Sequence, residues 1–89
     1  MDLRQLDMLR AIAETGSFTG AGEKLHVSQS AISRQIKLLE EELNEPLFSR
    51  SGRRVVITPA GETLLQLSHR VFADVNETKR LIRRSGRFS

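Results

Sequence analysis

The sequence contains no cysteine, tryptophan or tyrosine, and only four phenylalanines among its 89 residues. Without cysteine, disulfides and thiolate metal sites are excluded, and a reducing, cytoplasmic compartment is expected. The shortage of aromatic side chains leaves little for stacking on unpaired bases, which disfavours RNA as a partner. No apolar run approaches the length of a membrane span, and the N-terminal residues do not begin a signal peptide, so we expect no membrane association.

Acidic residues are absent from two windows of the chain, between Glu23 and Glu40 and between Glu45 and Glu62. The same two windows hold the cationic residues Lys24, Arg34, Lys37, Arg50, Arg53 and Arg54. The formal net charge of +3 by itself favours an anionic partner only mildly. The two basic segments indicate more, because a fold that brings them together would form one positive surface.

The segment from Val27 to Leu43 carries the strongest periodic pattern. Its apolar residues are Ile32, Ile36, Leu39 and Leu43. Their spacings of four, three and four predict one buried stripe along a helix. The opposite face begins with the hydrogen-bonding and cationic residues Gln29, Ser30, Ser33, Arg34 and Lys37, and ends with Glu40, Glu41 and Glu42. This separation is expected if only the N-terminal half approaches a polyanion, although an ordinary solvated helix would show the same stripe.

The first predicted helix covers residues 3–15. Asp2 and Gln5 have the spacing of a capping box, in which each residue satisfies a backbone N–H of the other. Gly16 is suited to the left-handed conformation that ends many helices. The predicted inward side chains are Leu6, Leu9, Ile12 and Ala13.

A short second helix is predicted to follow, capped by Ser17. Gly20 and Gly22 each lower helix stability by about 1 kcal/mol relative to alanine, so they indicate that another backbone comes close. Only residues 26–28 connect this helix to the next one. Two helices joined by so short a connection, the second with a polar outward face, predict a helix-turn-helix over about 18–37.

A small hairpin is predicted over about 47–57, after the third helix. Short β-prone runs flank a tip that contains Arg53 and Arg54, so the tip would be cationic. Such an arginine pair is commonly part of a solvated loop, but its place directly after a helix-turn-helix favours a wing that touches DNA. Arg50 has a competing structural use, which is pairing with an acid in the hairpin.

A long helix is predicted to begin at Thr58 and Pro59 and to continue to about Arg84, roughly 39 Å at 1.5 Å per residue. Two apolar strips follow it, one of them with coiled-coil spacing. One small domain cannot cover both strips along so long a rod, so we expect a homodimer. The residues expected at the dimer contact are Leu64, Leu65, Ser68, Val71, Phe72, Val75, Thr78 and Ile82, while Leu67 and Leu81 extend the second strip.

Together these features resemble the DNA-binding region of LysR-type transcriptional regulators. The segments that carry the resemblance are Gly16–Thr19, Leu25–Ile36, Pro46–Arg50 and Ile57–Gly61. It covers essentially the whole chain and implies a mainly α fold. A winged helix-turn-helix of three helices and a two-stranded hairpin would occupy 1–58, and a linker helix for dimerisation would occupy 59–89.

The resemblance also implies sequence-specific binding of double-stranded operator DNA, with the third helix in the major groove and the wing in the minor groove. A dimer would bind an inverted repeat. Family members usually continue into a ligand-binding domain, and many form tetramers. Any small-molecule effector is therefore expected to act through a domain missing here, in a cytoplasmic, nucleoid-associated protein.

Base contacts are expected from the start of the third helix. The resemblance and its exposed place make Gln29 the first candidate, because its amide can donate and accept one hydrogen bond each at an adenine edge. Ser33 and Arg34 are expected next, with Arg34 at a guanine or a phosphate. Ser30 and Ala31 would touch base edges or a thymine methyl group. Ser30 stands where the family often has proline, so the base preference at that position stays open.

Backbone contacts are expected from a second set of side chains. The candidates for phosphate contacts are Thr19, Lys24, Ser28 and Lys37. Arg53 would enter a narrowed minor groove, where the negative potential is enhanced. Arg54 would share that task or hold the DNA backbone.

Two other classes of function would be compatible with a small helical chain. An enzyme would have to use His26 or His69, but no acid is placed by the sequence to orient either histidine. Two histidines without cysteine also make a poor zinc site, so no catalytic residue, metal or cofactor is expected. A helical module that binds another protein would have no need of the acid-free windows, and it would show no salt-sensitive retention of DNA.

Overall fold

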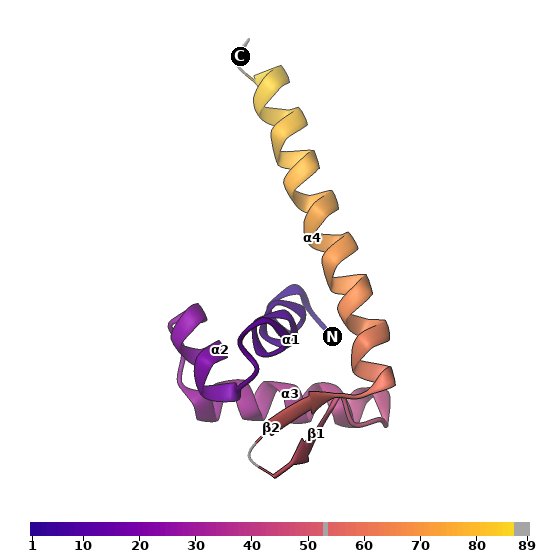
Figure 1. Cartoon of the computed structure of the whole chain (residues 1–89). Coiled ribbons are helices and arrows are strands. Elements are labelled where there is room, and N and C mark those ends of the chain that lie inside the picture. The colour runs from indigo at the N-terminus through magenta and orange to yellow at the C-terminus, as the bar shows by residue number, and fades with distance from the viewer. Residues whose placement is uncertain (53, 87–89) are drawn as a thin grey trace.

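The computed structural model of the chain describes residues 1–52 and 54–86. Its elements are α1 (Leu3–Thr15), α2 (Phe18–Leu25), α3 (Gln29–Leu43), β1 (Phe48–Ser51), β2 (Arg54–Ile57) and α4 (Pro59–Gly86). The first three helices and the hairpin form a head, from which α4 projects as a rod (Figure 1). The predicted mainly α fold, a winged helix-turn-helix followed by a long helix, is confirmed. Within the described residues, no helix is long and apolar enough to cross a membrane.

The predicted caps of α1 are present. Asp2 accepts a hydrogen bond from the Gln5 backbone N–H at 2.7 Å, and the Asp2 N–H donates to the Gln5 side chain at 3.2 Å. Gly16 follows the helix with φ at 79°, a left-handed conformation that favours glycine. The local sequence therefore determines both ends of this helix.

The core of the head is built around α1, which packs against α2, α3 and α4. Its buried face is therefore wider than the predicted stripe: Met8 and Ala11 are buried, whereas Ala13 is exposed, contrary to the prediction. The other core residues are Leu6, Leu9, Ile12, Ala21, Ile32, Ile36, Leu39, Leu47 and Leu64. The predicted stripe on α3 is confirmed, with Leu43 partly buried at its end.

The turn between α2 and α3 is tight. Ser17 Oγ accepts a hydrogen bond from the Gly20 N–H at 2.8 Å and caps α2 as predicted. His26 ends that helix in the left-handed conformation, with φ at 60°. A Cβ on Gly22 would lie 2.7 Å from the Val27 carbonyl oxygen, which confirms the predicted close approach of a backbone there. The atoms nearest a Cβ on Gly20 belong to the Ser17 and Thr15 side chains, so the same prediction for Gly20 is wrong. The two helices thus form the predicted helix-turn-helix.

The hairpin is antiparallel, with Phe48 opposite Ile57. Leu47, predicted as the first residue of the wing, is instead fully buried in the core. Its N–H donates to a Glu40 carboxylate oxygen at 2.7 Å, and its carbonyl accepts from the Thr58 N–H at 3.0 Å. Leu47 therefore anchors both ends of the hairpin to the head.

The start of α4 is as predicted. Thr58 Oγ1 accepts a hydrogen bond from the Gly61 N–H at 3.0 Å, and Pro59 takes the first helical position. A Cβ on Gly61 would lie 2.3 Å from the Leu47 carbonyl oxygen, so only glycine allows α4 to pass this close to the wing. The N-terminal part of the helix packs on α1 and the remainder extends beyond the head (Figure 1).

Candidate nucleic-acid interface

The first turns of α3 present an uncharged and cationic surface to solvent. Ser28 Oγ accepts a hydrogen bond from the Ala31 N–H at 3.1 Å and caps the helix. The exposed residues that follow are Gln29, Ser30, Arg34 and Lys37, with Ala31 and Ser33 half-buried beside them. Ile32 and Ile36 hold the opposite face in the core. In Figure 1, α3 and the hairpin lie at the end of the head away from the free end of α4.

The side chain of Gln29 is oriented by its neighbour one turn later. Its Nε2 donates a hydrogen bond to Ser33 Oγ at 2.8 Å. The carboxamide oxygen and the second N–H form no other hydrogen bond among the described residues. One acceptor and one donor therefore remain, which is the pair that an adenine edge requires. Beside them, the hydroxyls of Ser28 and Ser30 lie 3.2 Å apart.

The candidate phosphate-binding side chains of the helix-turn-helix differ in their partners. Arg34 and Lys37 form no ion pair within the described part of the chain. Lys24 is paired with Glu14 of α1, and this hydrogen bond lowers the pKa of the Glu14 carboxyl below its ordinary value. Thr19 is exposed in the first turn of α2. Arg34 and Lys37 are thus available to an anion, whereas Lys24 would have to exchange a carboxylate for a phosphate.

The wing is held against α2 by aromatic contacts. The rings of Phe18 and Phe48 lie 5.8 Å apart in an edge-to-face arrangement. The Arg50 guanidinium lies 5.7 Å from the Phe18 ring centroid, and it forms no ion pair among the described residues, so the expected pairing with an acid is wrong. Arg54 is exposed at the start of β2. Arg53, the expected minor-groove side chain, lies outside the described residues.

The residues expected at the dimer contact divide into two groups. Ser68 is fully buried and has no surface left for a partner helix, so the structure corrects that part of the prediction, whereas Leu64 keeps 7% exposure beside Leu43 and Leu67. Leu65 and Phe72 also pack on the core of the head. The other four, which keep exposed surface, are Val71, Val75, Thr78 and Ile82. The face of α4 with regular coiled-coil spacing is therefore covered by the head in its N-terminal part and exposed to solvent further along.

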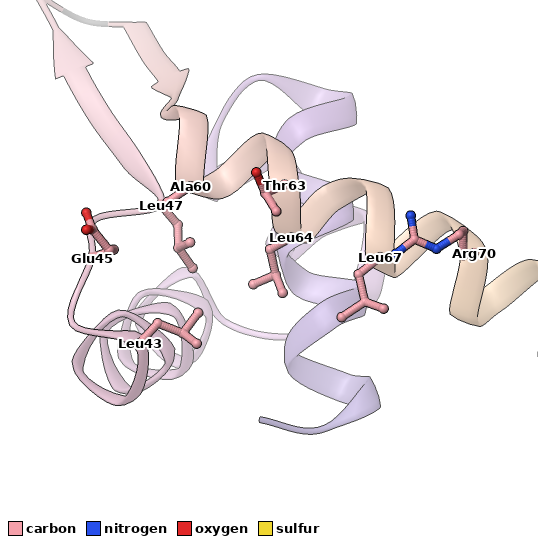
Figure 2. A pocket seen from close by; sticks show the side chains of 8 residues that line it. All are labelled: Leu43, Glu45, Leu47, Ala60, Thr63, Leu64, Leu67 and Arg70. Carbon is pink, nitrogen blue, oxygen red and sulfur yellow. The ribbon is translucent and has the colours of Figure 1, made fainter.

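An apolar groove of about 470 Å³ lies between the end of α3 and the start of α4. Its lining residues are Leu43, Glu45, Leu47, Ala60, Thr63, Leu64, Leu67 and Arg70. The side chains of Leu43, Leu64 and Leu67 point into the same space (Figure 2). The sequence pattern did not predict this groove, because Leu43 and Leu67 meet only through tertiary packing. The available signal was the four-residue spacing from Leu67 to Val71, which continues an apolar strip toward the groove.

Metal-ligating side chains are scattered across the molecule. Within the described residues, no group of three or more histidine, aspartate or glutamate side chains is arranged to hold a metal ion. His26 ends α2 and His69 lies on α4, and both are exposed. Neither belongs to the exposed face of α3.

Comparison with known proteins identifies clear relatives. The model of the family described as bacterial regulatory helix-turn-helix protein, lysR family, matches residues 3–62. An uncharacterised HTH-type transcriptional regulator in the ibpB-leuC intergenic region of Azotobacter vinelandii is 45% identical over 82 residues, which are 92% of this chain and 57% of the relative. A probable RuBisCO transcriptional regulator of Guillardia theta is 49% identical over 80 residues, 90% of this chain and 26% of the relative. The chain thus spans 57% and 26% of the lengths of these two proteins.

A solved structure resembles nearly the whole of this chain. The crystal structure of a BenM_DBD/benA site 1 DNA complex superposes with a TM-score of 0.90 at 37% sequence identity. The match covers 97% of both chains, so it includes the head and most of α4. The similarity therefore extends beyond the helix-turn-helix to the direction in which α4 leaves the head.

Proposed function

Because the chain belongs to the LysR family of bacterial regulatory helix-turn-helix proteins, we propose that it binds duplex DNA sequence-specifically as part of a transcriptional regulator. The observation that carries this proposal is the exposed start of α3, which has no acidic side chain from Gln29 to Lys37 and is backed by a buried stripe. The major groove of B-DNA admits an α-helix, and hydrogen-bonding and cationic side chains meet base edges and phosphates there. The similar BenM structure is described as a DNA complex, which supports the same use of this surface.

We assign direct recognition of bases to side chains in the first turns of α3. Gln29 would bind an adenine edge with the donor and acceptor that Ser33 leaves unoccupied. Arg34 would donate hydrogen bonds either to a guanine edge or to a phosphate of the DNA backbone. Ser30 and Ala31 would contact a base edge or a thymine methyl group.

Contacts to the DNA backbone are assigned to side chains around this core. Lys37, Ser28, Thr19 and Lys24 would bind phosphates and set the register of the head on the duplex. Lys24 would do so only by leaving Glu14. The wing would lie along the adjacent minor groove, with Arg53 inserted and Arg54 at its edge.

A homodimer is supported by the uncovered face of α4. Val71, Val75, Thr78 and Ile82 recur at spacings of four, three and four, so they share one face of the helix, and the half-buried Leu67 extends it by one turn. This face continues into the apolar groove beside Leu43. In a two-fold dimer with antiparallel α4 helices, the exposed apolar end of each rod would reach the groove of its partner.

This dimer would place two heads on an inverted repeat, with half-sites about one or two helical turns apart. Both relatives reported above are considerably longer than this chain. We therefore assign any small-molecule effector, and assembly into tetramers, to regions of the intact protein beyond this chain. DNA binding would place that protein at the nucleoid in the cytoplasm, without a catalytic role of its own.

Selection from random oligonucleotides, followed by mobility shifts over a salt series, tests DNA binding and its symmetry together. We expect enrichment of an inverted repeat and retention that weakens steeply as salt rises. A pool that shows no enrichment, or retention that does not respond to salt, would contradict sequence-specific binding and favour a protein-interaction module.

The dimer is tested by Val75→Asp, which puts a carboxylate on the uncovered face of α4. We expect the sedimentation coefficient to fall to that of a monomer, because an unpaired charge cannot be buried between two helices. Asn76→Asp adds the same charge to a neighbouring exposed position outside the strip and serves as the control. A Val75→Asp protein that sediments like the native chain would remove α4 from the dimer contact.

A further inference from the structure

The contact between α1 and α4 combines apolar packing with two polar contacts. Ser68 is fully buried, and its Oγ donates a hydrogen bond to the Leu6 carbonyl oxygen at 3.1 Å. The Arg10 guanidinium lies 4.1 Å from the centroid of the Phe72 ring. Asp7 holds the same guanidinium through a hydrogen bond of 2.9 Å. Each of the two polar contacts connects one residue of the head to one residue of α4.

The two polar contacts are separated by one turn on both helices. Leu6 and Arg10 are four residues apart on α1, and Ser68 and Phe72 are four residues apart on α4. Two attachment points about 6 Å apart along each axis restrain the crossing angle as well as the contact itself. Apolar surfaces pack in several similar arrangements, whereas a buried hydroxyl finds its partner in few of them, so it distinguishes one arrangement from the others.

We propose that Ser68 and Arg10 are positioning residues that set the angle of α4 against the head, and thereby the distance between the two α3 helices of a dimer. This inference rests on the proposed function, because it needs two heads on an inverted repeat. From Ser68 to the end of α4 at Gly86, the rod extends roughly 27 Å at 1.5 Å per residue. If α4 tilted by about 10° at its contact with α1, the far end of α4 would move by about 5 Å, which exceeds the rise of about 3.4 Å per base pair.

The first test measures affinity for a panel of inverted repeats whose spacers differ by single base pairs. For the native chain we expect one preferred spacer and about tenfold weaker binding one base pair away. Ser68→Ala should reduce that difference to about twofold and leave the affinity for an isolated half-site unchanged. Arg10→Gln removes the contact with Phe72 and should change the profile in the same direction, to a smaller extent.

Matched control variants distinguish an effect of the contact between α1 and α4 from a general loss of stability or of positive charge. Ile36→Val removes a buried methylene from α3, and we expect a lower melting temperature with an unchanged spacer profile. Arg80→Gln removes an arginine that is paired with Glu77 in the way Arg10 is paired with Asp7, but on the exposed part of α4. If either control flattened the profile as much as Ser68→Ala, the inference would be overturned.

A second measurement needs no DNA. The chain has no cysteine, so spin labels can be attached through Glu23→Cys and Asn76→Cys alone, in labelled protein diluted with unlabelled chain. We expect a narrow distribution of distances between the labels that broadens with Ser68→Ala and stays narrow with Ile36→Val. An unchanged width with Ser68→Ala would overturn the inference even if DNA binding persisted. If Ser68→Ala broadened the distribution but the native chain preferred no inverted repeat, the proposed function would be overturned and the positioning role of Ser68 would stand.

Discussion

The two halves of α3 share one buried stripe and differ on the outside. The stripe consists of Ile32, Ile36 and Leu39, none of them more than 2% exposed. The outer face of the first half carries Arg34 and Lys37 and no acid, whereas the second half carries Glu41 and Glu42. The two sides of α3 therefore have different roles: the buried side determines the fold, and the outer side determines which half can approach a polyanion.

Two of the three acids in the second half also have structural partners within the protein. Glu40 accepts the Leu47 N–H at 2.7 Å and so holds the start of the wing. Glu42 pairs with the ammonium group of Met1 at the N-terminus. These two acids therefore bind the protein itself, and the acids of the second half together would repel a phosphate backbone that approached too far along α3.

The largest effect is expected where the two halves are alike, in the buried stripe. Leu39→Ala should lower the free energy of unfolding by about 2–5 kcal/mol, because it deletes a fully buried side chain. Leu38→Ala removes the same atoms from a side chain that is 48% exposed, and we expect a change below about 0.5 kcal/mol. Urea unfolding followed by circular dichroism measures both. Equal losses in the two variants would mean that the stripe does not hold α3 in place.

Charge reversal in the first half should have the next largest effect. Arg34→Glu places a carboxylate against the DNA, and we expect roughly 100-fold weaker binding in fluorescence anisotropy at physiological salt. Glu41→Lys reverses the charge in the second half and should strengthen binding by no more than about threefold. Effects of equal size and opposite sign would show that only net charge determines affinity, and would contradict a DNA contact made by the first half of α3 alone.

A smaller effect is expected at the boundary between the halves. Lys37→Ala should weaken binding to an operator and to a scrambled duplex by the same factor, and reduce the slope of log affinity against log salt by about 1. Lys79→Ala removes the same charge from the exposed part of α4 and should leave the slope unchanged. A Lys37→Ala protein that lost affinity for the operator alone would place this side chain at a base instead.

The smallest effect is expected away from α3, at the pair of Glu14 and Lys24. The hydrogen bond from Lys24 depresses the pKa of Glu14, so its contribution to stability is complete above the ordinary pKa and is lost as pH falls through the lowered one. Both side chains are largely exposed, so Glu14→Gln should cost less than about 1 kcal/mol at neutral pH. Thermal melts at pH 7 and pH 3 check this, and a deficit that persisted at pH 3 would mean that the charge is not the cause.

Features set by short stretches of sequence were predictable. The capping box of Asp2 and Gln5, the left-handed Gly16 after α1 and the cap at Thr58 each depend on residues within one turn. The amphipathic stripe of α3 is equally local. These patterns were enough to predict the helix-turn-helix, the wing and the long helix with nearly correct boundaries.

Features that depend on the meeting of distant elements were not predictable. Ser68 and Thr78 belong to one periodic strip, yet Ser68 is fully buried and Thr78 is exposed. Periodicity shows which residues share a face, but not how far along the helix the head covers that face. The pairing of Lys24 with Glu14 has the same origin, since it joins two helices at an angle that no local pattern contains.

The most direct test of base recognition by the first half of α3 is Gln29→Ala, titrated against an operator and a scrambled duplex. We expect the ratio of the two affinities to fall by about 5- to 150-fold, the loss of one bidentate contact to a base, while binding to the scrambled duplex changes little. Equal losses on both duplexes would contradict base recognition by Gln29 and leave α3 with backbone contacts alone.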